Sequence, residues 1–227
     1  MAPSLKTLTL RALATTALVL AATLAQATDY VAGKHYTVLD EPIRTGDASK
    51  IEVTEVFWYG CGHCYAFEPL LEKWSKTLPL DVVLLRSPAI WHPTMELHAR
   101  AYYTAKALNV LDPLHQALFD AMNVDHNKLA TEDDIKKIFT AHGVDGDTFS
   151  KTFNSFGVGS AVGQADVRQR GYKISGTPEM VVEGKYRVSA SQAGSHEAML
   201  AVIDHLIAVE RAARAKRHAS DSAAPAK

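Results

Sequence analysis

The chain contains only two cysteines, Cys61 and Cys64, and the segment that holds them constrains the fold most strongly. Residues 51–58 are mostly β-branched and aromatic, which is typical of a buried strand, and Gly60 then allows the chain to turn. Apolar residues recur after Cys61 at the spacing of a helix that faces a core. Two cysteines at this spacing lie within one helical turn, so their sulfurs can form a disulfide without backbone rearrangement.

The cysteine pair could in principle also bind zinc, form a permanent structural disulfide or attach haem. A structural zinc needs four ligands, a second cysteine pair is absent, and His92 would complete such a site only in principle. A permanent Cys61–Cys64 disulfide would close a loop of two residues, which restricts the unfolded chain very little. Attachment of c-type haem requires a histidine directly after the second cysteine, where this chain has Tyr65. We therefore predict a redox-active pair with no metal and no cofactor.

The expected helix start assigns different roles to the two sulfurs. Cys61 faces the unpaired amides and the positive pole of the helix, which favour the nucleophilic thiolate over the thiol. Cys64, one turn further, is expected to be more buried and to act as the resolving thiol that attacks a mixed disulfide on Cys61. His63 lies between them, and positive charge or hydrogen bonds from it would make the disulfide more oxidising.

The order of the remaining segments predicts a split α/β domain. The predicted strands cover residues 36–39, 51–58, 81–85, 179–183 and 185–189. The helix after Cys61 joins two of these strands into a βαβ unit, for which parallel strands are expected. Residues 94–170 carry only helix signals, and a last helix covers about 194–211. The candidate caps and stop signals of the helical block are Thr94, Asp112, Thr131, Asp145, Gly143 and Gly157.

The first residues have the pattern of a secretory signal peptide. Lys6 and Arg11 precede an apolar run at 13–24, and Ala25-Gln26-Ala27 fits a cleavage site. Without these residues the chain carries a net charge of −3, which gives no reason to expect nucleic acid as a partner. The predicted organisation is a signal peptide at 1–27, a domain formed by 28–92 and 171–212, a helical insertion at 93–170 and a basic disordered tail at 213–227.

A second motif, Ser175-Gly176-Thr177-Pro178, precedes the hairpin. A bond that precedes proline can be cis, although a lone proline more often forms an ordinary trans turn. The βαβ and ββα units together with the cysteine pair match the thioredoxin fold, in which a cis-proline loop packs against the two cysteines. The predicted fold class is therefore α/β, a thioredoxin fold with an inserted all-helical subdomain.

Over essentially the whole mature chain, the sequence resembles the DsbA family of bacterial periplasmic thiol–disulfide oxidoreductases. The matching strings are E-V-F-W-Y-G-C-G-H-C-Y-A-F-E from Glu55 and G-T-P-E-M-V-V-E-G-K-Y-R-V from Gly176, with the helical insertion between them. The resemblance implies that Cys61 is the attacking cysteine and that Pro178 is cis beside the pair. It also implies that the backbone of Thr177 pairs with an extended substrate segment.

In such folds, Glu55 corresponds to a buried acid beneath the redox pair. An acid within a hydrophobic strand has a raised proton affinity and would assist proton transfer from Cys64. Equally, Glu55 would serve only as a structural partner of a base such as Arg86. Glu68, on the helix of Cys64, is a further candidate for the same charge cluster.

Two positions depart from the best-known DsbA motif. Gly62 replaces a proline, which gives the Gly-His dipeptide of protein disulfide isomerase, and Thr177 replaces a valine. Protein disulfide isomerase has a reduction potential of about −180 mV and DsbA of about −120 mV. We expect the reduction potential of this protein to lie between these two values.

The predicted function is that of a periplasmic dithiol oxidase that introduces disulfides into newly exported, cysteine-containing proteins. The resemblance implies reoxidation by a quinone-linked inner-membrane partner like DsbB. The alternatives are a reductase or isomerase of the same fold and a non-catalytic peptide-binding chaperone. Periplasmic isomerases usually dimerise through an extra domain, and no such domain is visible here, which favours the oxidase. We expect a monomer.

Overall fold

The computed structural model describes residues 29–223, so the predicted signal peptide lies outside the described residues. The strands are β1 Thr37–Val38, β2 Ile51–Phe57, β3 Val82–Pro88, β4 Glu179–Val182 and β5 Tyr186–Ser189. The helices are α1 Gly62–Ser75, α2 Pro93–Ala107, α3 Leu111–Asn123, α4 Glu132–Ala141, α5 Gly146–Phe153, α6 Phe156–Gly171, α7 Ala190–Ala193 and α8 His196–Ala223. In the described part of the chain, no helix is both long and apolar enough to cross a membrane.

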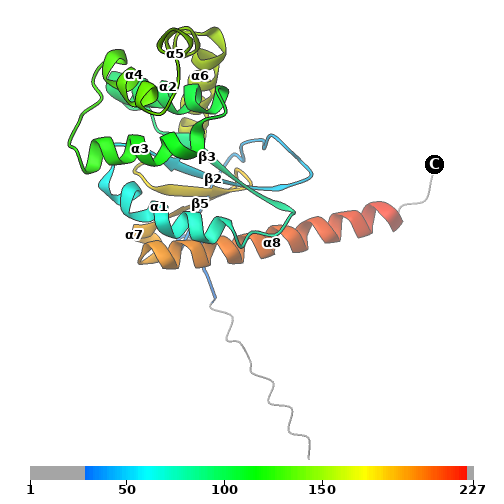
Figure 1. Ribbon diagram of the computed structural model, residues 1–227. Coiled ribbons are helices and arrows are strands. Elements are labelled where there is room, and N and C mark those ends of the chain that lie inside the picture. Colours follow the sequence, from blue (N-terminus) through cyan, green and yellow to red (C-terminus); the bar gives the residue numbers. More distant parts are fainter. Residues whose placement is uncertain (1–28, 224–227) are drawn as a thin grey trace, which may run out of the picture.

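The strands form one mixed sheet in the order β1-β5-β4-β2-β3. β2 pairs with β3 in parallel, as the βαβ unit requires, and every other pairing is antiparallel. All seven residues of β2 are buried because helices cover both faces of the sheet. This arrangement confirms the predicted thioredoxin fold with a helical insertion (Figure 1).

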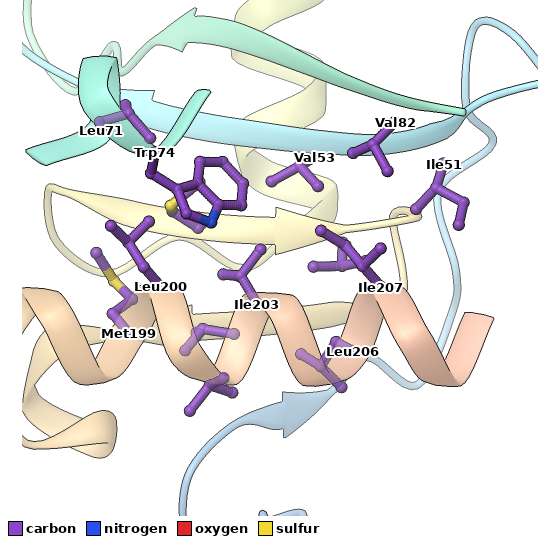
Figure 2. Packing of buried hydrophobic residues seen from close by; sticks show 14 of the residues in the cluster. Ile51, Val53, Leu71, Trp74, Val82, Met199, Leu200, Ile203, Leu206 and Ile207 are labelled. Atoms are coloured by element: carbon purple, nitrogen blue, oxygen red, sulfur yellow. The ribbon is translucent and has the colours of Figure 1, made fainter. Parts of the chain in front are cut away.

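One large core cluster lies between the sheet and the helices α1 and α8. Figure 2 shows Leu71 and Trp74 of α1 and Ile203 of α8 beside Val53 of β2. On the opposite face, Val56 packs with Met95 in a smaller cluster. The alternation of β2 side chains between two buried faces therefore anchors the strand that leads to the cysteine pair.

The insertion, α2 to α6, packs against the junction between β2 and α1. Its core cluster includes Phe57, Tyr59 and Cys64 together with Phe119 of α3. In Figure 1 these helices lie above the sheet, while α1 and α8 lie below it. The cysteine pair consequently sits where the thioredoxin-like part meets the insertion.

Residues 213–223 of the predicted disordered tail are helical instead, since α8 continues to Ala223, and residues 224–227 lie outside the described residues. Arg211 binds Asp81 with two hydrogen bonds of 2.7 and 3.0 Å. Arg214 donates to the carbonyl of Lys50 at 2.6 Å and to the carboxylate of Glu183 at 2.7 Å. The segment is rich in alanine and arginine, which favour helix, and these two arginines fix it to the body of the protein.

Candidate active site

Cys61 is the N-cap residue of α1. Its sulfur accepts a hydrogen bond from the backbone N–H of Cys64 at 3.4 Å, so it occupies one of the unpaired amides at the helix start. Cys61 is half-buried, whereas Cys64 is fully buried, and both are free thiols. Only Cys61 is therefore open to another molecule.

The two sulfurs differ in charge at neutral pH. The hydrogen bond with the Cys64 side chain outweighs the effect of burial and, together with contacts from Thr177 and backbone amides, lowers the pKa of Cys61 to about 5. Burial raises the pKa of Cys64 far above its ordinary range. The pair thus combines a thiolate that reacts with a thiol that stays protonated.

The proline loop lies directly beside Cys61. The Thr177–Pro178 peptide bond is cis, and the Cys61 thiol donates to the carbonyl oxygen of Thr177 at 3.2 Å. A cavity of about 420 Å³ next to this contact is lined by His63, Thr177, Pro178 and His196, among other residues. The fold thus brings together two motifs that lie 116 residues apart in the sequence.

Gly62 and His63 occupy the exposed first turn of α1. The backbone N–H of His63 contributes to the lowered pKa of Cys61. The His63 ring faces His196 of α8, with ring centroids 6.4 Å apart. A Cβ on Gly62 would meet only Asn123 Oδ1, at 3.9 Å, so the space around this position does not demand glycine.

Glu55 lies beneath the pair, fully buried in β2. It is opposite Arg86 in the parallel register, and Arg86 Nε lies 3.4 Å from Glu55 Oε2. Neither carboxylate oxygen has a hydrogen-bond partner among residues 29–223. Burial, reinforced by the charge of Glu68, raises the pKa of Glu55 to about 8. Both predicted features, a raised proton affinity and a nearby base, are therefore present at once.

Glu68 joins the same cluster from α1. Burial raises the pKa of Glu68, but His115 and the guanidinium of Arg86, with which Glu68 forms a close ion pair, outweigh it and hold the pKa below its ordinary value. His115 Nε2 lies 3.6 Å from Glu68 Oε2, and its Nδ1 is hydrogen-bonded to the Tyr59 hydroxyl at 2.8 Å. Burial lowers the pKa of His115, so its ring is neutral at pH 7.

Sequence reasoning missed His115, Tyr59 and His196. His115 is a polar residue on the buried face of α3, and that interruption of an apolar face was the only available signal. His196 begins α8 and packs on Phe67 at a centroid distance of 5.0 Å, a contact that no local pattern reveals. Among the described residues, no group of three or more His, Cys, Asp or Glu side chains is arranged to hold a metal ion.

A thioredoxin fold in which a half-buried sulfur caps a helix, with a buried sulfur one turn further, defines a thiol–disulfide oxidoreductase. Residues 80–200 match the family model described as a DSBA-like thioredoxin domain. The chain belongs to the DsbA family, and it is a dithiol oxidase of that family, which confirms the resemblance seen in the sequence.

Relatives and solved structures agree with this assignment. The thiol:disulfide interchange protein DsbA of Pseudomonas aeruginosa is 42% identical over 192 residues, which cover 85% of this chain and 91% of that protein. The protein of the same name from Azotobacter vinelandii is 41% identical, covering 82% and 87%. The crystal structure of Pseudomonas aeruginosa DsbA has a TM-score of 0.79 at 41% identity and covers 83% of this chain and 98% of that one. DsbA from Xylella fastidiosa has a TM-score of 0.76 at 30% identity, covering 81% and 98%.

Proposed function

We propose that Cys61 is the sulfur that exchanges with substrate and that Cys64 is the resolving thiol. In the oxidised enzyme, a substrate thiolate attacks Cys61 Sγ and the Cys64 sulfur leaves. A second substrate thiolate then attacks the substrate sulfur of the mixed disulfide and expels Cys61 as a thiolate. The observation that carries this proposal is the position of Cys61 at the start of α1, where its sulfur accepts from the backbone N–H of Cys64 at 3.4 Å. This position lowers the pKa of Cys61, and a sulfur with a low pKa leaves readily and favours net oxidation of the substrate.

The buried Cys64 sulfur needs a proton when it leaves. Glu55, whose pKa of about 8 keeps it mostly protonated at pH 7, is the proposed donor, and the substrate-derived proton restores it afterwards. Glu68 is the second proposed carboxylate of this cluster, and it adjusts the proton affinity of Glu55 through their mutual repulsion. In the reoxidation half of the cycle the proton moves in the opposite direction.

Thr177 and Pro178 are the proposed substrate-binding residues. The Thr177 carbonyl lies 3.2 Å from Cys61 Sγ, so a substrate bonded to that sulfur runs past the same backbone. We expect an extended substrate segment to pair with Thr177 as an added strand. His63 and Gly62 are the proposed tuning residues, and we expect a reduction potential between about −180 and −120 mV.

The proposed substrates are newly exported proteins with free cysteines, in the periplasm. Residues 1–27 would direct export as a cleaved signal peptide. We further propose that a quinone-linked membrane partner like DsbB reoxidises the Cys61–Cys64 pair and that the protein acts as a monomer. The proposed domain organisation is a thioredoxin-like domain formed by residues 28–92 and 171–212, with residues 93–170 as the insertion. Residues 213–223 continue the last helix and are not proposed as a disordered tail.

The test uses the mature protein and a reduced peptide with two cysteines. Reduced Cys64→Ser, mixed with a one-cysteine peptide whose sulfur is linked by a disulfide to a small aromatic thiol, should displace that thiol and accumulate a mixed disulfide between Cys61 and the peptide, and Cys61→Ser should form none. Wild type should convert the two-cysteine peptide to its disulfide form with one equivalent of oxidised enzyme. A Cys61→Ser protein that still supports disulfide formation in cells would contradict the catalytic proposal and favour the chaperone.

The Gly62-His63 dipeptide and the hydroxyl of Thr177 favour a second candidate, an isomerase or reductase of the same fold. Insulin reduction and refolding of a scrambled protein, compared with oxidation of a reduced peptide, separate the two candidates. A reduction potential near that of thioredoxin, about −270 mV, would favour the reductase.

A further inference from the structure

The loop that carries Thr177 is held by a charged pair that the mechanism above does not use. Glu179 is the first residue of β4, and Arg187 lies on the neighbouring strand β5. Arg187 pairs in register with Val181, two positions beyond Glu179, so both side chains lie on the same face of the sheet. Their side chains are 5% and 19% exposed.

Glu179 holds the middle of the loop. Its Oε1 accepts a hydrogen bond from the Ser175 hydroxyl at 2.9 Å. The backbone N–H groups of Ser175 and Gly176 also point to this carboxylate. One hydrogen bond and two nearby backbone amides, from two consecutive residues, therefore act on one buried side chain, directly before Thr177.

Arg187 holds the beginning of the loop. Its Nη1 donates to the carbonyl oxygen of Lys173, and its Nε lies 3.5 Å from Glu179 Oε2. The pair thus connects the end of α6 to the strand that follows the loop. Thr177 lies inside the segment that these contacts enclose.

The pair is a poor source of stability. Burying two charges costs several kcal/mol, and a well-packed apolar pair is often as stable or more so. Within residues 29–223, neither Glu179 Oε2 nor Arg187 Nε has a hydrogen-bond partner, so the cost is only partly offset. The geometry of the loop, rather than the free energy of folding, is what these contacts determine.

We propose that Glu179 and Arg187 are positioning residues, which fix the Thr177 backbone against Cys61 Sγ and keep its edge aligned for a substrate strand. This inference rests on the proposed strand pairing at Thr177. Without the pair, the loop between Lys173 and Pro178 keeps its covalent connections but loses its attachment to β4 and β5. Binding of an extended peptide then weakens, while small thiols, which need no strand pairing, react as before.

The test compares peptide and small-thiol substrates in Arg187→Met, Glu179→Gln and the milder Ser175→Ala. Each protein, in its oxidised form, is reacted with a reduced two-cysteine peptide and with reduced glutathione. We expect KM for the peptide to rise about tenfold in Arg187→Met, the scale of one lost hydrogen bond to a charged group, with kcat nearly unchanged. The rate with glutathione should stay within about twofold of wild type, and thiolate absorbance should report a shifted pKa of Cys61, because its contacts with the Thr177 side chain and with the Thr177 carbonyl are both loosened.

Glu210→Gln is the matched control. Glu210, on α8, is 2% exposed and pairs with Lys185, in the turn before β5, at 2.6 Å, so the variant also leaves a buried carboxylate position without its ion pair, but not one that touches the loop. It should lower the melting temperature and leave both peptide KM and the thiolate titration unchanged. An equal rise in KM in this control, or an unchanged KM and unchanged titration in all three loop variants, would overturn the proposal.

The parent proposal fails separately. If wild type shows no preference for the peptide over glutathione, strand pairing at Thr177 is wrong, whatever the variants do. The thiolate titration then still decides whether Glu179 and Arg187 hold the loop against Cys61, since that measurement needs no substrate.

Discussion

At the scale of single residues, Cys61 and Cys64 differ because one of them caps a helix and the other lies inside it. The cap position gives Cys61 hydrogen bonds from Cys64 and from backbone amides, and part of its surface stays in contact with solvent. Cys64 has no exposed surface, and burial keeps its proton in place. Although Cys61 and Cys64 are only three positions apart, the first is therefore a nucleophile and the second an inert thiol.

The first prediction concerns the charge of Cys61. Iodoacetamide should modify Cys61 of the reduced protein with a midpoint near pH 5, and Cys64 should stay unmodified in the native state. Because the folded pKa lies below the unfolded value of about 9, the reduced form should gain stability over the oxidised form as pH rises from about 5 to 9. Melting temperatures of both forms across this range measure the effect. A constant difference between them would contradict the lowered pKa.

The second prediction concerns Glu55→Gln, which separates proton transfer from structural pairing. If Glu55 supplies the proton, the step in which Cys64 leaves should slow about 100-fold at pH 7, measured in a single turnover. The raised folded pKa also means that the stability of wild type relative to the variant is highest below pH 4.5 and falls as pH rises through about 8. A variant with this stability profile but an unchanged rate would leave Glu55 with only its structural role beside Arg86.

The sequence predicted the residues whose signals are local. Cys61, His63 and Cys64 follow from one string, and the buried acid Glu55 follows from its strand. The Tyr59–His115 hydrogen bond joins residues 56 positions apart and depends on how α3 packs against the junction, which no periodicity encodes. The same is true of His196, which reaches the site only because α8 crosses beneath the sheet.

At the scale of elements, the turn between β2 and α1 is tightly packed at Gly60. A Cβ there would lie 2.4 Å from the ring of Trp58, whereas a Cβ on Gly62 would have its nearest neighbour at 3.9 Å. Gly60→Ala should therefore lower the free energy of unfolding by about 1–3 kcal/mol in urea titrations. Gly62→Ala is the control, and it should be neutral or stabilising by up to about 1 kcal/mol because alanine favours the helix. Equal stabilities for the two variants would exclude the clash with Trp58.

Helix boundaries show where local rules hold. Thr131 and Asp145 are N-caps whose side chains accept from backbone amides, as their sequence context predicted. Thr94 and Asp112 are not N-caps. They are the second residues of α2 and α3, which begin at Pro93 and Leu111. Gly143 follows α4 with a positive φ, as a stop signal should.

The prediction that Gly157 ends a helix was wrong, since Gly157 lies in the first turn of α6. Ser155, two residues before it, caps that helix with its hydroxyl. A glycine next to a good capping residue marks a helix start as readily as a helix end, and only the tertiary contacts decide which.

The extension of α8 leads to a prediction for Arg214→Ala. The change removes hydrogen bonds to the carbonyls of Ala48 and Lys50 and to the Glu183 carboxylate, and leaves that buried acid without its cation. We expect a loss of about 1–3 kcal/mol in the free energy of unfolding and unchanged peptide oxidation. Lys216→Ala, at an exposed position of the same helix, is the control and should change stability by less than about 0.5 kcal/mol. A stable Arg214→Ala protein would show that the end of α8 is not attached as described.

At the scale of the whole molecule, the insertion and the thioredoxin-like part share one core at the redox site. Phe119 of α3 packs against Phe57 and Tyr59, with ring centroids 5.8 and 4.9 Å apart, and against His115. Cys64 belongs to the same cluster. The chemistry therefore depends on how the two parts pack, although neither cysteine lies in the insertion.

Phe119→Ala tests this dependence. Removing a fully buried phenylalanine should cost about 3–5 kcal/mol of unfolding free energy and should also let water reach Cys64. Alkylation of Cys64 in the native reduced protein should then become measurable. Phe139→Ala, equally buried but in contact with Phe149 of α5, should lose similar stability and keep Cys64 protected. If both variants expose Cys64 alike, general loosening rather than the shared core explains the effect.

The length of α8 has a practical consequence. Its 28 residues span about 42 Å, and its first residue, His196, borders the reactive end of the molecule while its last described residue projects past the sheet (Figure 1). A fluorophore, a biotin or a solid support coupled at the far end of this rod would stand well clear of the sulfur that meets client proteins. Immobilised or labelled preparations made in this way should therefore keep the turnover of the free protein, whereas a label placed at the other end of the same helix should block it.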